Sequence, residues 1–516
     1  MPKPRIVFYT DGRHAHIYRY EPPTCKDEYL ALIDELVGTS IEAVMLCLGE
    51  GRTMLHDTKA GELLGHNVGK WDHNVFRRAH QNAKGLIDAG HDPLRILCER
   101  AHEKGMLLYA TLLVQKHGVN EATVRCSDFR KKNAHLEIGA AGDVEAGFPG
   151  FDGLDFKHDE VRNERFAIVE EVVNDYSVDG FELNLHQLPY FFHPDQIEAG
   201  RTIMTDWVGR VHEAVASSGS GRELVIQIPL SIEACQSVGL DPERWIKDRI
   251  VDVLVGAGGP EGQMTDFAPL LEAAGRTQTR VFASMHNGVG SDRLGIAPLP
   301  AIRATACNYW SQGVDGLYLS GWHGEWPYED AFYGKLRELP HPDIMAAKDK
   351  FYFIPTSDQA SSPLPVKLEL NKPATVGFTI TDDLPRFGEA GRIHEVLLRM
   401  RVIDHTELDR LSFKLNGVEL PDHTHRRINE LYKQRVPHYR VMGGYWHIYR
   451  LGPDHWPVAG RNTLEVTLLQ RDADLVGDSC TLRDVELEIK YLMGRSFHRG
   501  DGIGIGDVDP DLGPHD

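Results

Sequence analysis

The sequence predicts an α/β protein: a (β/α)8 TIM barrel followed by an all-β, jelly-roll-like sandwich domain. Two observations carry this prediction. Short apolar strands alternate with amphipathic helices eight times before residue 350, which is typical of a parallel sheet. After that point the pattern changes to short alternating runs separated by turns, as in antiparallel sandwiches. No G-x-G-x-x-G follows the first strand and no phosphate-binding loop is present, so an open doubly wound sheet is disfavoured.

The barrel elements follow from hydrophobic periodicity, which is near-continuous in buried strands and has a period of 3.6 in helices. The expected strands are 5–10, 42–48, 106–114, 181–185, 223–229, 250–255, 280–285 and 314–319. The expected helices are 26–37, 92–104, 159–176, 200–217, 241–248, 267–274 and 300–313. Between the third strand and the next helix, residues 115–155 are too long for a plain connector and form an inserted lobe.

We therefore expect a barrel over 1–350, a linker over 351–365, a β-sandwich accessory domain over 366–495 and a flexible acidic tail over 496–516. The expected sandwich strands are 366–370, 375–380, 396–402, 411–415, 445–451, 463–469 and 482–491. Aromatic residues gather in one stretch of this domain, namely Tyr432, Tyr439, Tyr445, Trp446 and Trp456. The sandwich could bind carbohydrate, but bracing of the barrel or of a homo-oligomer interface is the favoured interpretation.

The amino-acid composition indicates which classes of binding partner and which cellular compartment to expect. The charged share is 26% and the net charge is −20, which argues against nucleic acid or an anionic membrane as the main partner. The seven cysteines include no C-x-x-C pair, which is typical of reduced cysteines in a cytoplasmic protein. The first residues contain no apolar stretch of signal-peptide length, and no apolar run is long enough to span a membrane, so we expect neither a signal peptide nor a membrane span.

The fourth strand carries the clearest chemical signal. In S-V-D-G-F-E-L-N-L-H-Q-L-P-Y-F-F-H (177–193), apolar and polar residues alternate. Strand side chains alternate with period two, so Glu182, Asn184 and His186 share one face. In a closed barrel we expect that face to point inward, toward the mouth where reactive groups lie. Asp179, at the start of the strand, is expected to be structural.

Other strand ends add polar and aromatic groups to the same mouth. The predicted substrate-binding residues are Asn184, His186, Tyr9, His14, His16, Glu50, Arg52, Gln227, His286, Asn287, Trp322 and His323. Further strand-end residues are Gln115, Lys116, His117, Glu261, Ser284, Tyr318 and Trp326. Amides and acids pair with hydroxyl groups and tryptophan faces stack on sugar rings, so this set predicts a carbohydrate substrate.

Cleavage of a glycosidic bond requires a proton donor and a second carboxylate. Glu182 is the predicted donor, and Phe181, Tyr190, Phe191 and Phe192 are expected to raise its pKa and keep it protonated. Asp11 and Glu325 are the predicted catalytic partners of Glu182, while Glu50 and Glu261 remain open as alternatives.

Two alternatives stay open. His14-x-His16 after the first strand resembles the paired metal ligands of barrel hydrolases, and His186, His286, His323 and Glu182 would complete such a site. The fifth and sixth strands end in Q-I-P-L-S and V-G-A-G-G and supply no histidine, so we expect no cofactor, with a divalent metal as the alternative. The other alternative is a non-catalytic carbohydrate-binding protein.

The stretch L-D-F-K-H-D-E-V-R-N-E-R-F-A-I-V-E-E-V-V-N-D-Y-S-V-D-G-F-E-L-N-L-H-Q-L-P-Y-F-F (154–192) resembles bacterial glycoside-hydrolase-like TIM-barrel proteins distantly related to glycoside hydrolase family 10. Residues 239–246 and 251–255 and the trailing β domain are similar to the same group. The resemblance implies a carbohydrate-active barrel with Glu182 in the acid position. Members of this family carry a second acidic residue on this strand, and Asn184 stands at that position here. The arginine that follows in the family motif is also missing, with Gln187 near its place. The seventh strand ends in Ser-Met-His-Asn where the main glycosidase clan has a glutamate.

Overall fold

The structure is a computed structural model that describes residues 3–115, 125–145, 147–257, 262–275, 277–288, 296–357, 362–429, 444–475 and 480–494. The chain folds into two compact units. The first comprises 1–260, 265–287 and 312–340, and the second comprises 261–264, 288–311 and 341–516. The predicted tail over 496–516 lies outside the described residues.

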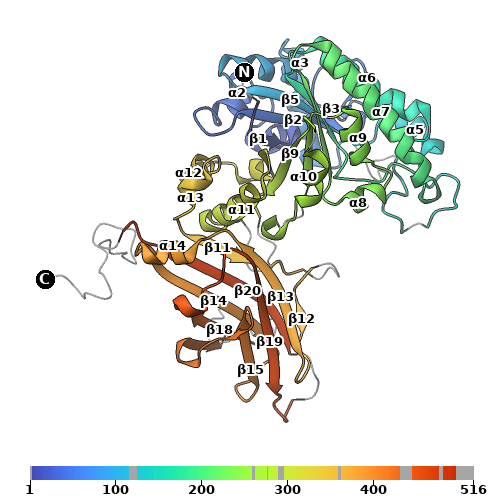
Figure 1. The fold of residues 1–516 in the computed structure, drawn as a ribbon. Helices are drawn as coiled ribbons and strands as arrows, with labels where there is room; N and C mark the ends of the chain where they lie inside the picture. Colours follow the sequence, from blue (N-terminus) through green and yellow to red (C-terminus); the bar gives the residue numbers. More distant parts are fainter. Residues whose placement is uncertain are drawn as a thin grey trace. The chain divides into compact units, whose positions relative to one another are not determined.

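The first unit is a closed parallel barrel, as the sequence predicts (Figure 1). Its strands are β1 (Ile6–Thr10), β2 (Ala43–Glu50), β5 (Leu107–Leu113), β6 (Gly180–Asn184), β7 (Glu223–Pro229), β8 (Val253–Ala257), β9 (Arg280–His286) and β10 (Gly316–Ser320). Each strand pairs in parallel with its neighbours in this order, and β1 pairs with both β2 and β10. That double pairing of β1 closes the ring, which leaves no exposed barrel edge.

The first unit also contains helices of 3 to 22 residues. They are α1 (Gly12–His14), η1 (Ala15–Arg19), α2 (Lys26–Asp34), α3 (Asn74–Asp88), α4 (Pro93–Glu103), α5 (Asp128–Lys132), α6 (Asp159–Asp175), α7 (Ile197–Ser218), α8 (Ile232–Gln236), α9 (Pro242–Asp248), α10 (Ala268–Ala274) and α12 (Asp330–Glu338). Asp92 and Asp241 accept hydrogen bonds from backbone N–H groups in the first turns of α4 and α9, and each precedes a proline. Such caps satisfy N–H groups that have no partner inside the helix.

The barrel interior is apolar at its centre and polar toward the mouth. A buried cluster joins Val7, Ala43, Met45, Tyr109, Val225, Val253, Val255, Phe282 and Tyr318, which come from seven of the eight strands. The remaining strand, β6, contributes Glu182, which is fully buried. Side chains two residues apart on a strand share a face, so Asn184 lies on the face of Glu182, one layer nearer the carboxyl end of the barrel.

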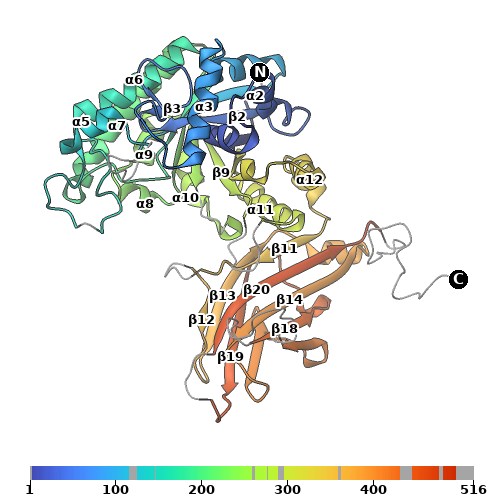
Figure 2. The ribbon, with the colours of Figure 1, turned by 180° about the vertical axis from the view of Figure 1, so that it is seen from behind.

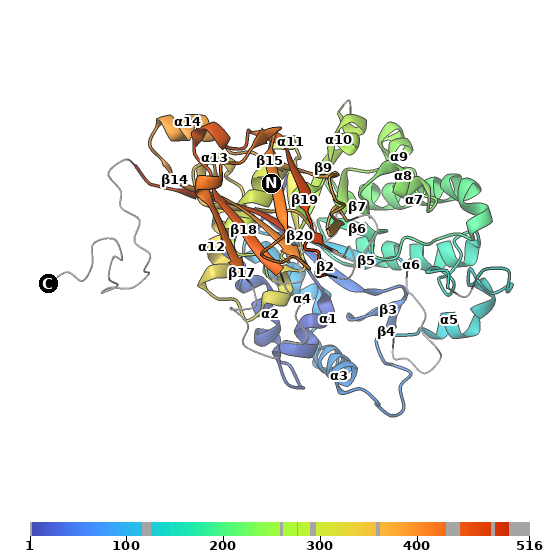
Figure 3. The same cartoon turned by 90° about the horizontal axis from the view of Figure 1, so that it is seen from below.

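A small extension follows β2. Strand β3 (Thr53–Met54) pairs antiparallel with the end of β2, and β4 (Glu62–Leu63) pairs with β3 (Figure 3). Gly49 accommodates the return because a Cβ there would lie 1.9 Å from the Thr53 carbonyl oxygen.

The second unit is built on two antiparallel sheets (Figure 2). One contains β11 (Lys350–Phe353), β12 (Val366–Lys367), β14 (Ile393–Ile403), β17 (His425–Asn429), β18 (Gly444–Arg450) and β20 (Thr481–Tyr491). The other contains β13 (Pro373–Ile380), β15 (Arg410–Leu415), β16 (Val418–Glu419) and β19 (Gly460–Gln470). One hydrophobic cluster includes Phe378 and Val466 from the second sheet and Leu398 and Leu487 from the first, so the two sheets share a core.

Two features of this unit differ from the expected boundaries. Strand β11 occupies the first residues of the predicted linker, where it pairs with β20. Helix α11 (Leu299–Gln312) matches the predicted helix over 300–313, but most of it belongs to the second unit, where the Asn308 side chain donates to the carbonyl oxygens of Gln263 and Thr379. Helices α13 (Pro342–Met345) and α14 (Leu384–Glu389) also belong to this unit.

Two of the predicted aromatic residues of the sandwich, Trp446 and Trp456, pack within the unit, Trp446 buried and Trp456 partly buried. Trp446 is 7% exposed, and the Trp456 indole donates to the carbonyl oxygen of Leu451 at 3.0 Å. Tyr432 and Tyr439 lie outside the described residues. Across the described residues, no helix combines the length and the apolar character that a membrane crossing requires.

Candidate active site

A cavity of about 390 Å³ opens at the carboxyl ends of the barrel strands. Its lining residues are Tyr9, Asn184, His186, Gln187, Gln227, Ala257, Ser284, His286, Tyr318, Ser320 and Gly321. The polar groups of this lining are amides, hydroxyls and imidazoles, and no described lining residue is a carboxylate, lysine or arginine. The mouth therefore fits a neutral ligand with many hydrogen-bonding groups.

The wall of the cavity is ordered by hydrogen bonds around Asn184. Its amide nitrogen donates to Oε1 of Gln227 on the next strand at 2.5 Å. Its amide oxygen accepts from the backbone N–H groups of His186 and Gln187 at 3.2 and 3.0 Å. Asn184 thus ties β6 to β7 and shapes the turn that follows β6, while the Ser284 and Ser320 hydroxyls lie 3.2 Å apart on the other wall.

Glu182 lies beneath this cavity rather than on its wall. Its Oε2 accepts hydrogen bonds from the Thr111 hydroxyl at 2.5 Å and the Tyr318 hydroxyl at 3.1 Å. Its Oε1 is buried and has no hydrogen-bond partner among the described residues. Burial raises the pKa of Glu182 to about 7, although both hydroxyls act to lower it. Because Tyr318 also lines the cavity, it links the mouth to this carboxyl group.

The aromatic residues predicted to raise the pKa of Glu182 do not surround it. Phe181 and Phe191 are fully buried, and Phe191 packs against Phe156, whose ring also contacts Trp207 of α7. Phe181 neighbours Glu182 in a strand and so projects to the opposite face, toward the outer layer. Tyr190 packs against Phe148. The carboxyl is desolvated by the barrel interior instead.

Among the described residues, the other predicted acids are held in ion pairs and do not line the cavity. Asp11 caps α1 and accepts from the backbone N–H and Nε of Arg13 at 3.1 and 3.3 Å. Burial acts to raise the pKa of Asp11, but the charge and hydrogen bonds of Arg13 outweigh it and lower that pKa. Arg13 also pairs with Glu50 at 2.6 Å, and Glu50 accepts from Nε of Arg125 at 2.8 Å.

Glu325 is similarly held in an ion pair, and the ring of Trp322 nearby is buried. Glu325 pairs with Lys335 at 2.8 Å and accepts from the Asn287 amide at 3.3 Å. Trp322 is 0% exposed and its indole donates to the carbonyl oxygen of Met285, so the predicted role in substrate binding does not fit its burial. The Trp326 indole donates to Glu35 at 3.1 Å.

The predicted histidines separate into two places. The rings of His14 and His323 meet edge to face with centroids 5.3 Å apart, and His323 also contacts Tyr9 of the cavity wall. His16 lies elsewhere: it is fully buried and stacks on Tyr29 of α2 at 4.7 Å. The π-helical turn η1 carries His16 away from the mouth, which removes it from the predicted substrate and metal sets.

Desolvation keeps the mouth histidines neutral. It lowers the pKa of His14 to about 4 and also lowers the pKa values of His186, His286 and His323. A neutral imidazole can accept a proton, and Nδ1 of His186 is buried with no hydrogen-bond partner among the described residues. Arg52 does not join this group, since it pairs with Glu62 at 2.9 Å and with Glu164 at 3.4 Å.

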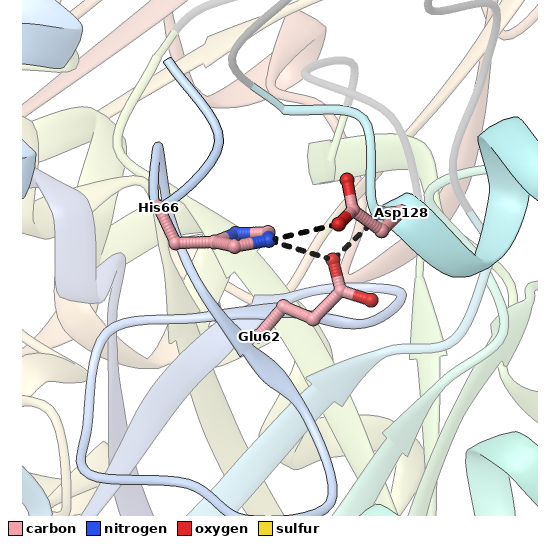
Figure 4. A group of neighbouring side chains, drawn as sticks. All are labelled: Glu62, His66 and Asp128. Atoms are coloured by element: carbon pink, nitrogen blue, oxygen red, sulfur yellow. Dashed lines mark hydrogen bonds and ion pairs between the residues drawn. The ribbon is translucent and has the colours of Figure 1, made fainter. Parts of the chain in front are cut away.

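A metal site of the predicted composition does not form among the described residues. There the group whose ligand atoms come within reach of one ion is Glu62, His66 and Asp128 (Figure 4). Glu62 already accepts from Nε of Arg52 at 2.9 Å and from the backbone N–H of Asp128 at 2.7 Å. These contacts account for the cluster as a hydrogen-bonded ion-pair network.

Lys116, His117 and Glu261 lie outside the described residues. Gln115 is described: its amide nitrogen donates to the carbonyl oxygens of Leu154 and Tyr190 at 2.9 and 2.8 Å, so it anchors the inserted lobe.

Thr111 is the site residue that the sequence reasoning missed. Apart from Tyr109, it is the one polar residue of the strand L-L-Y-A-T-L-L, and it shares a face with that tyrosine. Thr111 could have been recognised because its hydroxyl lies on the inward face of a mostly apolar barrel strand. Gln187 and Ser320 of the cavity wall were also not predicted as site residues.

Comparison with known proteins yields structural neighbours only. No protein-family model and no curated protein matches the chain. An endo-beta-1,4-mannanase from Thermotoga petrophila is similar at 11% identity and a TM-score of 0.45, covering 95% of this chain and 98% of that one. A GH36 alpha-galactosidase from Geobacillus stearothermophilus gives 12% identity and a TM-score of 0.41, with 95% and 56% covered. A chitinase from Chromobacterium violaceum gives 9% and 0.35, with 65% and 99% covered. These neighbours are glycoside hydrolases.

Proposed function

We propose that this barrel is a glycosidase, a hydrolase that cleaves a glycosidic bond in a small glycoside or oligosaccharide bound at the mouth. The observation that carries the proposal is the state of Glu182. It is a buried carboxyl group that keeps a proton near neutral pH, with one oxygen lacking a partner among the described residues. An acid whose pKa lies near the working pH is suited to protonate a leaving group.

The cavity chemistry supports a carbohydrate as the ligand. A sugar presents neutral hydroxyl groups, each of which donates and accepts hydrogen bonds. The amides of Asn184, Gln187 and Gln227 and the hydroxyls of Ser284 and Ser320 offer both kinds of partner. An anionic ligand would meet no described lysine or arginine in the lining.

The reaction also needs a group that activates water. Asp11 and Glu325 remain candidates for the second carboxylate, but unlike Glu182 each is held in an ion pair. We assign the role to His186, which lines the cavity as a neutral imidazole. Water loses a proton to the unprotonated ring nitrogen of His186 as its oxygen bonds to the anomeric carbon. The electron pair of the broken C–O bond goes to the leaving oxygen, which takes the proton from Oε1 of Glu182.

The test is replacement of the acid by its neutral isostere. Glu182→Gln is expected to lower kcat on a panel of aryl glycosides by about 10²–10⁴, the usual contribution of a general acid. Thermal melts of the variant should match those of the wild type at pH 5, where Glu182 is already neutral. Glu223→Gln, at the opposite end of the same barrel, is the matched control and should retain kcat per folded molecule. Retained turnover in Glu182→Gln removes Glu182 from the mechanism.

A second candidate function is a carbohydrate-binding protein without turnover. It is favoured by the absence of any carboxylate among the described lining residues. Calorimetric binding of oligosaccharides to the wild type, with no hydrolysis of any panel member, would establish it. Metal analysis of the purified protein tests the remaining alternative of a metal-dependent enzyme.

A further inference from the structure

We infer that Thr111 and Tyr318 are positioning residues that assign the transferable proton of Glu182 to Oε1 and hold Oε2 ready to carry the charge left behind. This inference rests on the proposed function and identifies residues that act through Glu182.

The assignment follows from hydrogen-bond direction. Both hydroxyl groups donate to the same carboxyl oxygen, Oε2. An oxygen that already accepts two hydrogen bonds has no favourable position for a hydrogen of its own. In the neutral acid the proton therefore resides on Oε1, the oxygen without a partner among the described residues. A buried donor without an acceptor is costly, so a ligand oxygen that accepts this proton gains from the arrangement.

We call the hydroxyl groups of Thr111 and Tyr318 the clamp. They come from different parts of the barrel and meet at Glu182 because the ring of strands is closed. Thr111 lies beside Glu182 in the register of β5 and β6. Tyr318 is on β10, which is four strands from β6 in either direction around the ring. Its side chain reaches across the interior to Glu182. An open sheet with the same sequence of strands would separate these two residues.

The clamp contributes most after the proton has left. Proton transfer from Oε1 to the leaving oxygen leaves a carboxylate in a desolvated interior, which is unfavourable without donors. Two hydroxyl donors are already directed at Oε2, so no reorganisation is needed as the charge develops. They favour the charged form, in opposition to burial, and the pKa of Glu182 settles at about 7 between these effects.

The barrel supplies its own matched control. Tyr109, also an interior residue, donates its hydroxyl hydrogen to Glu223 at 3.0 Å near the other end of the barrel. Tyr109→Phe therefore removes the same kind of bond as Tyr318→Phe, without touching Glu182. Thr111→Ser is the second control because it retains the hydroxyl that Thr111→Val removes.

The primary measurement is the titration of Glu182 itself, followed in the full chain by the infrared band of the protonated carboxyl. The band is assigned as the signal lost in Glu182→Gln. Thr111→Val and Tyr318→Phe should each raise the pKa of Glu182 by roughly one unit, because a hydrogen bond to a charged group is lost. Thr111→Ser and Tyr109→Phe should leave it unchanged. An unchanged titration in both Thr111→Val and Tyr318→Phe, or an equal change in Tyr109→Phe, overturns the inference.

Activity provides a separate readout once a substrate is found. With a higher pKa the acid stays protonated to higher pH, so the basic limb of the kcat profile should move up by roughly one unit in both variants. The plateau should fall roughly tenfold, since the carboxylate formed is less stabilised. Shifted titrations together with no turnover of any glycoside by the wild type would remove the proposed function and leave the clamp intact. Turnover of a glycoside by the wild type, together with unshifted Glu182 titrations in the variants, would keep the proposed function and remove the clamp.

Discussion

Two buried glutamates on neighbouring strands of this barrel meet different partners. Glu182 on β6 accepts hydrogen bonds from two hydroxyl groups, and none of the described lysines or arginines pairs with its carboxyl. Glu223 on β7 accepts from the Tyr109 hydroxyl at 3.0 Å but also pairs with Arg280 at 2.6 Å and with Lys3 at 2.8 Å. Each has a tyrosine partner, and the difference between them is the cation.

The two glutamates therefore differ in role, one being structural and the other able to donate a proton. Glu223 contacts the side chains of Arg280 and Lys3 and serves as half of an ion pair at the amino end of the barrel. Desolvation without a cation favours the neutral form, so Glu182 keeps a proton that it can give away. The position at the carboxyl end of the strands, near the mouth cavity, is where barrel enzymes place reactive groups.

The largest expected effect on stability is at Glu223. Glu223→Gln leaves the Arg280 guanidinium, whose side chain is 15% exposed, without its counter-charge. Loss of one member of a buried ion pair costs about 3–5 kcal/mol. We expect a lower urea midpoint for the barrel transition at pH 5, while Glu182→Gln should leave it near the wild-type value. Similar midpoints for the two variants would contradict the distinction between the two glutamates.

The next effect is a dependence of stability on pH that belongs to Glu182. Its pKa is about 7 in the folded protein and near 4.5 in the unfolded chain, so the folded state binds the proton more tightly. Its contribution is fully present below pH 4.5 and is lost as pH rises through 7, a change of about 3 kcal/mol.

Glu182→Gln should abolish this component. The variant should match the wild type near pH 4.5 and exceed its unfolding free energy at pH 8, as measured by urea titrations at both values. Parallel pH profiles for the two proteins would show that Glu182 ionises normally.

A smaller effect is expected from the tyrosines. Tyr109→Phe and Tyr318→Phe each remove one buried hydrogen bond to a carboxyl group, a loss of about 1–2 kcal/mol at pH 8. At pH 5, where Glu182 is neutral, the loss in Tyr318→Phe should be smaller than at pH 8. Denaturation at both pH values measures this, and an equal loss at pH 5 and pH 8 would count against a neutral Glu182.

The smallest effect is expected at Lys3. This side chain is 64% exposed, so its pairing with Glu223 is screened by solvent. Lys3→Ala should cost less than about 1 kcal/mol, and added salt should reduce the difference further. A loss as large as that of Glu223→Gln would assign the anchoring of Glu223 to Lys3 rather than to Arg280.

Sequence reasoning anticipated the parts of the site that depend on local pattern. Strand β7 has the predicted bounds, and the alternation of residues 181–186 places Glu182 and Asn184 on one face because strand geometry has period two. It did not anticipate that His16 leaves the mouth, because the spacing H-x-H carries no sign of the π-helical turn that redirects it. The burial of Trp322 was equally hidden, since it depends on where the loop after β10 packs.

By itself, the sequence predicted where the barrel strands lie and which face of the strand around residue 182 turns inward, and therefore that an acid enters the barrel at position 182. Those properties are local, because backbone geometry and burial of apolar side chains set them within a few residues. Only the tertiary structure decided what that acid meets. Tyr318 is 136 residues away along the chain and reaches Glu182 because the ring closes, while Arg13, Arg125 and Lys335 occupy the other carboxylates through the packing of loops and helices around the mouth. Acidity depends on these neighbours, and for that reason it emerged only with the fold.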